Sequence, residues 1–235
     1  STLSQIVRNK IFFTTKMEYF VNIIKTSPFP DQNPGTSGLR KRCQRFMEKN
    51  YTENFIQSIF LNIPENTRES STLIIGGDGR YFCAEATIIA VKIAIANKFK
   101  KVMVCKDGIG STPAISYLIK KYSAVGALIL TASHNAGGPD NDFGIKYNTS
   151  SGGGASENLT ASVYETSKSI ASYHICQDFN AKIDTIHSER IKVHLLDGTI
   201  HMCQVDVIDS IVDYVEYMKE IFDFGKITNF LNSGF

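Results

Sequence analysis

The 235-residue sequence has no tryptophan, few prolines and cysteines, and no marked excess of either charge. Its five cysteines stand singly, without a C-x-x-C pair, which excludes a disulfide framework and a zinc site of ordinary spacing and favours reduced thiols. A net charge of +2 gives no basis for a nucleic-acid partner. No apolar run approaches the roughly 18 residues of a membrane span. The composition therefore predicts a globular, cytoplasmic protein.

Residues 1–16 differ from the rest of the chain in charge. They contain three basic residues, no acidic residue and five Ser or Thr, whereas residues 17–235 hold 22 basic and 23 acidic residues. A basic, hydroxyl-rich and acid-free start is typical of an organellar targeting segment, such as a mitochondrial one. The same composition fits a vector remnant or an extension ahead of a start at Met17. These interpretations stay open.

Short apolar strands alternate with helical segments between residues 39 and 150. The apolar spacing predicts strands at 72–75, 102–105, 127–130 and 144–148, and helices at 39–63, 84–97 and 112–122. This alternation predicts an α/β fold in which helices cover both faces of a mixed or largely parallel sheet. Ligands of such sheets gather at loops after the carboxyl ends of strands, here Gly76–Arg80 and Thr131–Asp142.

The pattern changes beyond residue 150. A Gly- and Ser-rich connector at 151–156 precedes a predicted helix at 157–173, and polar strands follow around a turn at Asp197 and Gly198. New amphipathic helices are expected at 208–222 and 227–231. About thirty residues do not bury a core of their own. We therefore expect one domain over 17–204 and the incomplete start of a second over 205–235.

The loop after the 127–130 strand contains Ser133, His134 and Asn135, followed by two glycines. A Ser–His pair alone is a weak signal, and an ordinary polar loop is the alternative. Glycines let backbone approach a ligand, and clustered N–H groups after a strand favour an anion. A phosphoryl group on Ser133 would need positive charge nearby, and Arg40 and Lys146 are candidates to supply it.

The segment Gly35–Arg40 predicts an anion-binding helix start. It offers flexible glycines, the hydroxyls of Thr36 and Ser37, and basic residues that begin at Arg40 and continue along the expected helix. The alternative is a capped helix with a solvated basic face. It is not a Walker loop, because G-x-x-x-x-G-K-S/T is absent. Asp78 is the single carboxylate of Gly76–Arg80, so that segment is predicted to be a turn and not a metal site.

Several motifs, in order, resemble eukaryotic phosphoglucomutases of the α-D-phosphohexomutase superfamily, including the exocytosis-linked parafusins. The resemblance covers about Met17 to Phe224. It rests on Gly35-Thr-Ser-Gly-Leu-Arg-Lys-Arg42, Tyr51-Thr-Glu-Asn-Phe-Ile-Gln-Ser-Ile-Phe60, Gly76-Gly-Asp-Gly-Arg-Tyr81, Ser111-Thr-Pro-Ala114, Thr131-Ala-Ser-His-Asn135 and Asp142-Phe-Gly-Ile-Lys-Tyr-Asn148.

The resemblance implies that Ser133 is a phosphoserine exchanging its phosphoryl group with a sugar phosphate. Glucose 1-phosphate and glucose 6-phosphate would interconvert through glucose 1,6-bisphosphate. It also implies that His134 handles a proton, that Arg40 and Lys146 stabilise charge, and that the phosphate contacts include Thr36, Ser37 and Asn135. A magnesium ion would bridge the phosphoserine and three aspartates of a D-G-D-G-D loop.

The sequence departs from the family pattern. The D-G-D-G-D loop, the sugar-recognition loop and the later phosphate-binding loop are absent from it, and Ala136 stands where the family usually has proline. Two hypotheses follow. The chain is the phosphoserine-bearing part of a phosphoglucomutase, inactive by itself, or it is a shortened, parafusin-like paralogue that binds protein partners as a structural subunit.

Overall fold

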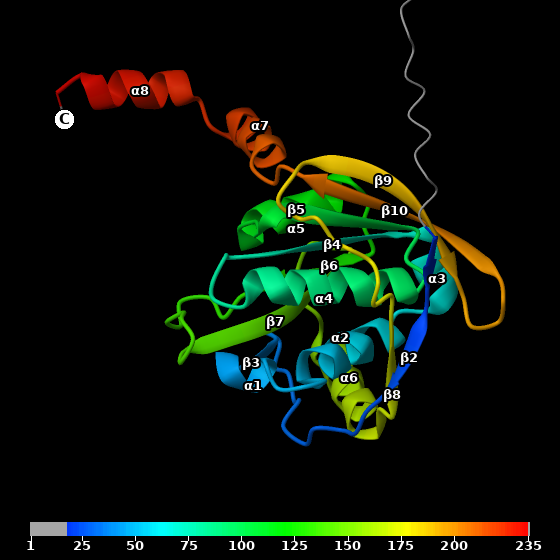
Figure 1. Ribbon diagram of the computed structural model, residues 1–235. Coiled ribbons are helices and arrows are strands. Elements are labelled where there is room, and N and C mark those ends of the chain that lie inside the picture. The colour runs from blue at the N-terminus through cyan, green and yellow to red at the C-terminus, as the bar shows by residue number, and fades with distance from the viewer. Residues whose placement is uncertain (1–17, 235) are drawn as a thin grey trace, which may run out of the picture.

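The computed structural model describes residues 18–234, so the predicted leader at 1–16 lies outside the described residues. Figure 1 shows the strands gathered into a twisted sheet with helices on both sides. The strands are β1 (Glu18–Phe20), β2 (Asn22–Lys25), β3 (Leu39–Arg42), β4 (Thr72–Gly77), β5 (Lys101–Ile109), β6 (Gly126–Leu130), β7 (Asp142–Thr149), β8 (Ser172–Ile175), β9 (His187–His194) and β10 (Ile200–Ile208). The helices are α1 (Cys43–Phe46), α2 (Tyr51–Leu61), α3 (Glu65–Ser70), α4 (Cys83–Ala96), α5 (Thr112–Lys121), α6 (Glu157–Ser169), α7 (Val212–Ile221) and α8 (Phe224–Asn232).

Eight of these strands form one mixed sheet in the order β1-β9-β10-β5-β4-β6-β7-β3. The central strands β10, β5, β4 and β6 are parallel to one another, whereas β7 and β3 at one edge are antiparallel to their neighbours. Strands β2 and β8 form a separate antiparallel pair. The predicted α/β class with a mixed, largely parallel sheet is confirmed.

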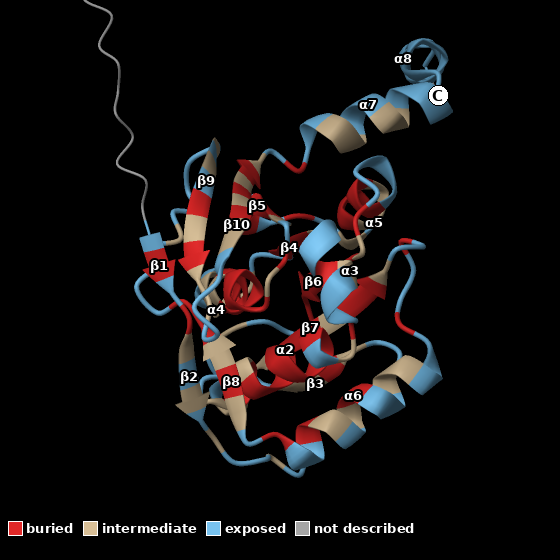
Figure 2. Cartoon of the chain, turned by 90° about the vertical axis from the view of Figure 1, so that its right-hand side faces the viewer, coloured by how far each residue is buried: buried red, intermediate tan, exposed pale blue. Residues whose placement is uncertain are grey.

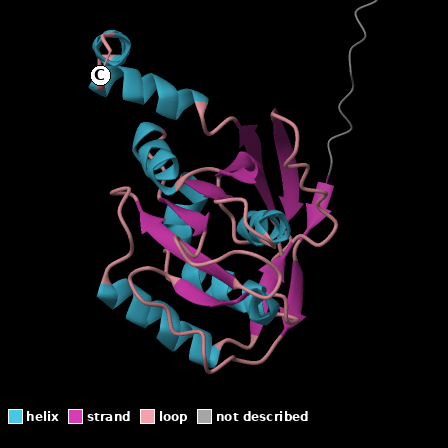
Figure 3. Cartoon of the chain, turned by 90° about the vertical axis from the view of Figure 1, so that its left-hand side faces the viewer, coloured by secondary structure: helices cyan, strands magenta, loops and turns pink. Residues whose placement is uncertain are grey.

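Alternate residues of the central strands supply two cores, one on each face of the sheet. In β4, Leu73 and Ile75 belong to the larger core, which also takes in α2 and α4, while Ile74 packs with Ile115 and Leu118 of α5 on the opposite face. This alternation follows from the two-residue period of a strand. Figure 2 shows the buried residues concentrated in the sheet and in the helix faces turned toward it, and Figure 3 shows the helices on either side of the strands.

The predicted helix at 39–63 is wrong at its start. Residues 39–42 form β3, which pairs with β7, and only a short helix and then α2 follow. Leu39, Cys43 and Phe46 are all buried, so their spacing imitated one helical face, although Leu39 is buried as part of a strand. The proposed anion-binding helix start at Gly35–Arg40 is therefore a turn that leads into an edge strand.

The other predicted elements are found close to their expected positions. The strand at 144–148 begins earlier, as β7, and most of its residues are buried. The helix predicted at 157–173 ends at Ser169, because its last residues join β8. Strand β10 continues through the expected boundary between 204 and 205, and α7 and α8 follow it.

None of the helices in residues 18–234 is long and apolar enough to cross a membrane.

Candidate active site

Ser133 lies three residues beyond the end of the buried strand β6, in the loop that returns to β7. Its side chain is exposed, and its backbone has a positive φ of 54°, which residues other than glycine rarely adopt. The sharp turn lifts the hydroxyl away from the strand. A hydroxyl presented in this way at the carboxyl end of a central strand is accessible to a ligand.

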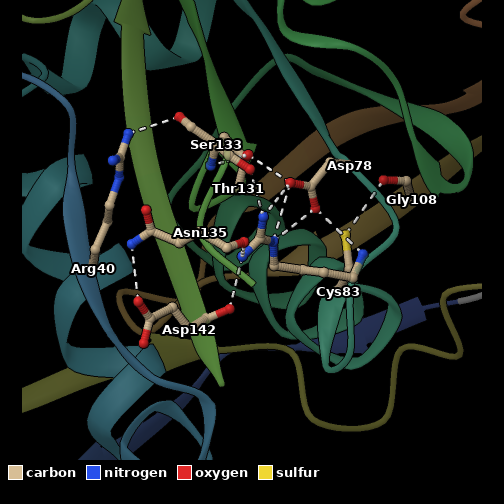
Figure 4. A network of polar contacts seen from close by, with 9 residues as sticks. Arg40, Asp78, Cys83, Gly108, Thr131, Ser133, Asn135 and Asp142 are labelled. Atoms are coloured by element: carbon tan, nitrogen blue, oxygen red, sulfur yellow. Dashed lines mark hydrogen bonds and ion pairs between the residues drawn. The ribbon is translucent and has the colours of Figure 1, made fainter. Parts of the chain in front are cut away.

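Arg40 reaches Ser133 from the sheet edge. It lies on β3 opposite Gly144 of β7, and its Nη2 donates a 2.7 Å hydrogen bond to Ser133 Oγ. Figure 4 shows the two side chains pointing toward one another. Arg40 Nε is buried and has no hydrogen-bond partner among the described residues. The contact with Ser133 is therefore made by Nη2, at the end of the guanidinium.

Gly144 makes this approach possible. A Cβ at Gly144 would lie 2.3 Å from the carbonyl oxygen of Thr131 and 3.2 Å from Arg40 Cγ. The Thr131 N–H donates to the Gly144 carbonyl at 2.8 Å, so the start of the loop is held against β7. A side chain at position 144 would separate the loop from β7 and crowd Arg40.

A polar network that includes Asp78 and Thr131 holds the loop in place (Figure 4). Asp78 Oδ2 accepts a 2.6 Å hydrogen bond from Thr131 Oγ1, and Thr131 Oγ1 accepts one from the Ser133 N–H at 2.9 Å. Arg80 forms an ion pair with Asp78 at 2.8 Å and donates to the carbonyls of Ser133 and Asp142 at 3.0 and 2.7 Å. These contacts join the loops after β4 and β6.

Burial acts to raise the pKa of Asp78, but hydrogen bonds from Arg80 and Thr131 together outweigh it and hold the pKa below that of a free carboxyl. Asp78 is therefore ionised at neutral pH. Cys83 lies beside this network, where burial raises the pKa of its thiol to about 11. The neutral thiol is a poor nucleophile at neutral pH, which leaves the Ser133 hydroxyl as the exposed candidate.

Asn135 lies in the same loop and donates from Nδ2 to Asp142 Oδ2 at 2.9 Å, so it ties the two ends of the loop together. His134 is exposed next to Ser133. Thr36 and Ser37 are exposed at the tip of the Gly35–Gly38 turn.

Lys146 lies on β7, two residues along from Gly144. It lines a cavity of about 20 Å³ between β7, the Gly35–Gly38 turn and α6. No ion pair joins Lys146 to a carboxylate within residues 18–234. The structure thus brings Arg40 onto Ser133 and places Lys146 beside the neighbouring turn, where its charge is uncompensated by an acidic partner.

Two residues of this network are not predicted from the sequence. The local pattern at Asp78 and Arg80 indicates only a turn, yet these residues hold both ends of the Ser133 loop. A signal is present: two loops that each follow a parallel strand lie at the same end of the sheet, and β4 and β6 are neighbours.

Residues 31–174 match the family Phosphoglucomutase/phosphomannomutase, alpha/beta/alpha domain I. The chain belongs to this family. It is 49% identical to a phosphoglucomutase of Rhizobium radiobacter over 92% of this chain, and 42% identical to phosphoglucomutase-1 of Oryctolagus cuniculus over 89% of it. The resemblance carried by the motifs is confirmed at the level of the family.

A solved structure is similar as well. The exocytosis-sensitive phosphoprotein pp63/parafusin of Paramecium, described as a phosphoglucomutase in its open form, superposes with a TM-score of 0.83 at 35% identity over 89% of this chain. The chain covers 38% of that protein, and 38% and 37% of the two curated relatives. The similarity therefore concerns the amino-terminal portion of these longer proteins.

Proposed function

We propose that the protein is a phosphoglucomutase in which Ser133 carries the phosphoryl group. In one half-reaction, the sugar hydroxyl of glucose 1-phosphate attacks the phosphorus of phosphoserine. The bond between phosphorus and Ser133 Oγ breaks, and the hydroxyl proton is passed on as glucose 1,6-bisphosphate forms. Transfer of the other phosphoryl group back to Ser133 releases glucose 6-phosphate. The observation that carries this proposal is the 2.7 Å contact between Arg40 and an exposed Ser133 hydroxyl.

Arg40 is proposed to stabilise the charge that develops on the transferring group. Phosphoryl transfer depends mainly on positioning and electrostatic stabilisation, and a guanidinium suits a phosphate because of its fork of donors. Nη2 of Arg40 already lies 2.7 Å from Ser133 Oγ, where a phosphoryl group on Ser133 would be attached. Lys146, whose charge has no acidic partner in the described chain, is proposed to assist from its place beside the Gly35–Gly38 turn.

The other candidate residues from the sequence are assigned the remaining roles. His134 is proposed to take and return the proton of the reacting hydroxyl, because an imidazole nitrogen can either accept or donate a proton. Thr36, Ser37 and Asn135 are proposed to contact the sugar phosphate. The hydroxyls and amide can donate to phosphate oxygens.

A magnesium site is not built by the described residues alone. Residues 18–234 contain no group of three His, Cys, Asp or Glu side chains arranged to hold a metal ion. Asp78 and Asp142 are already engaged by Arg80 and Asn135. The described chain would contribute Ser133, through its phosphate, and the carboxylate ligands would have to come from elsewhere.

A second candidate function is a structural or binding subunit, the parafusin-like alternative. Exposed apolar side chains on α7 and α8, including Val212 and Leu231, favour it. Free thiols at all five cysteines accord with a cytoplasmic location for either function.

The proposal is tested by tandem mass spectrometry of the protein isolated in the presence of glucose 1,6-bisphosphate. One phosphate on Ser133 is expected, and Ser133→Ala serves as the control that gains none. A protein without phosphate at Ser133 would overturn the proposal.

A coupled assay for glucose 6-phosphate with magnesium separates the two candidates. Because the chain covers under two fifths of its relatives, we expect no turnover from these 235 residues alone. Ordinary turnover would contradict the expectation that these 235 residues are inactive by themselves.

A further inference from the structure

Arg80 is the most heavily engaged side chain near Ser133, although it does not touch the hydroxyl. Its side chain is 8% exposed. Nη1 donates to the carbonyl oxygens of Asp142 at 2.7 Å and Asn135 at 3.4 Å, while Nη2 donates to that of Ser133 at 3.0 Å. One guanidinium thus holds three backbone positions of a single loop.

The same guanidinium reaches the other side of Ser133 through two further residues. Nε and Nη2 of Arg80 bind both oxygens of Asp78, at 3.0 and 2.8 Å. Asp78 then accepts from the Thr131 hydroxyl, which accepts from the Ser133 N–H. Both backbone polar groups of Ser133 are therefore fixed by one connected set of contacts that starts at Arg80.

This set of contacts accounts for the positive φ of Ser133. A serine held at 54° is in a region that L residues avoid, so the surrounding contacts must maintain it. With its N–H and carbonyl both fixed, Ser133 presents Oγ to Arg40. Asp78 and Arg80 carry opposite charges, so the pair anchors the loop without adding net charge beside the phosphoryl site.

We propose that Arg80 is a positioning residue for phosphoryl transfer, acting through Asp78 and Thr131 to hold Ser133 in the conformation that aims Oγ at Arg40. The inference rests on the proposed function. It assigns Arg80 no contact with the substrate. Its loss should therefore lower the rate of transfer to Ser133 and leave the concentration of sugar phosphate needed for half-saturation nearly unchanged.

The test compares Arg80→Lys with Arg190→Lys, the same substitution at an exposed residue of β9. A lysine retains the charge but lacks the planar fork that binds several acceptors at once. Hydrogen exchange at the amides of Ser133, Asn135 and Asp142 should accelerate at least tenfold in Arg80→Lys, while amides of β4 and β6 exchange at the wild-type rate. Arg190→Lys should leave all of these amides unchanged.

The second readout is phosphorylation of Ser133 by glucose 1,6-bisphosphate. In Arg80→Lys the maximal rate should fall at least tenfold with the half-saturating concentration within twofold. Thr131→Val removes only the hydroxyl that links Asp78 to Ser133, so the maximal rate should fall by a smaller factor. This variant replaces Arg80→Lys in the test if Arg80→Lys does not fold.

The positioning role would be overturned if the loop amides of Arg80→Lys exchanged at the wild-type rate. It would also be overturned if only the half-saturating concentration of glucose 1,6-bisphosphate changed. Failure of wild-type Ser133 to accept phosphate would instead overturn the proposed function. The exchange measurement would still decide whether Arg80 holds the loop.

Discussion

The Ser133 loop and the helices α7 and α8 differ in how far their side chains make contacts within the chain. In the loop, the network residues Asp78, Arg80 and Thr131 are paired inside the chain. In α7 and α8 no residue is buried, and apolar side chains such as Leu231, 65% exposed, face outward. Figure 2 shows α7 and α8 extending away from the buried sheet.

The difference indicates which region of the chain depends on internal contacts for its conformation. The loop keeps a strained serine in place with internal hydrogen bonds, so its geometry does not depend on a partner. Helix α7 contacts the domain mainly through α5. Tyr217 stacks on Tyr117 with ring centroids 4.2 Å apart, and Lys121 forms an ion pair with Asp213. Substitutions should therefore be costly in the loop and nearly neutral on the outer faces of α7 and α8.

The largest effect is expected from Arg40→Met. The variant keeps most of the side-chain length but removes the donor to Ser133 Oγ, so phosphorylation of Ser133 should slow by about 100- to 1,000-fold, as when one electrostatic donor is removed from an active site. Rapid-quench measurement of phosphate incorporation checks this. A rate within threefold of wild type would contradict the role of Arg40. Lys41→Met, on the same strand, is the matched control.

Gly144→Ala should destabilise the fold. Its Cβ would lie 2.3 Å from the Thr131 carbonyl oxygen, and relief of such overpacking costs roughly 1–3 kcal/mol in the free energy of unfolding. Urea denaturation measures the change. Gly35→Ala is the control, because a Cβ added at Gly35 would have nothing within 4 Å of it, and equal stability losses in the two variants would refute the packing argument.

Asp78→Asn should reduce stability in a pH-dependent manner. The hydrogen bonds of Asp78 hold its pKa below the unfolded value, so its stabilisation is complete above about pH 4 and is lost as the pH falls through the lower folded pKa. The variant should be less stable by roughly 1–3 kcal/mol at pH 7, since a buried guanidinium loses its charged partner. Urea titrations from pH 7 to pH 3 should show the difference in free energy of unfolding between wild type and variant narrowing below about pH 4. A difference that widens as the pH falls would contradict the expected direction of the pH dependence.

The smallest effect is expected from Leu231→Ala on α8. Because this side chain is 65% exposed, the free energy of unfolding should change by less than about 0.5 kcal/mol. Leu130→Ala, at the fully buried end of β6, is the matched control and should cost roughly 2–5 kcal/mol. Similar losses at both positions would remove the contrast between the two regions.

Much of the fold is predictable because the central strands are short apolar runs ended by polar or glycine-rich turns. Residues 39–42 are not, since Leu39 continues the apolar spacing of the helix that follows, and only its pairing with Ile145 of β7 makes it a strand. The spacing of apolar residues does not distinguish burial by a strand from burial by a helix at such a junction.

The candidate site is predictable in part. Ser133 and Arg40 stand out in the sequence, and the structure places them in hydrogen-bond contact across 93 residues of chain. The links from Asp78 and Arg80 depend on strand order, which places the loops of β4 and β6 side by side. Local patterns carry no such information, so the sequence indicates only an ordinary turn at these residues.

The central claim is that Arg40 binds the phosphoryl group carried by Ser133. Phosphorus NMR titration of the phosphorylated protein tests it most directly, because an unperturbed phosphoserine has a second pKa of about 6. A guanidinium beside the phosphate favours its dianion, so the pKa should lie below that value in the wild type and return toward it in Arg40→Met. The same pKa in both proteins would contradict the account.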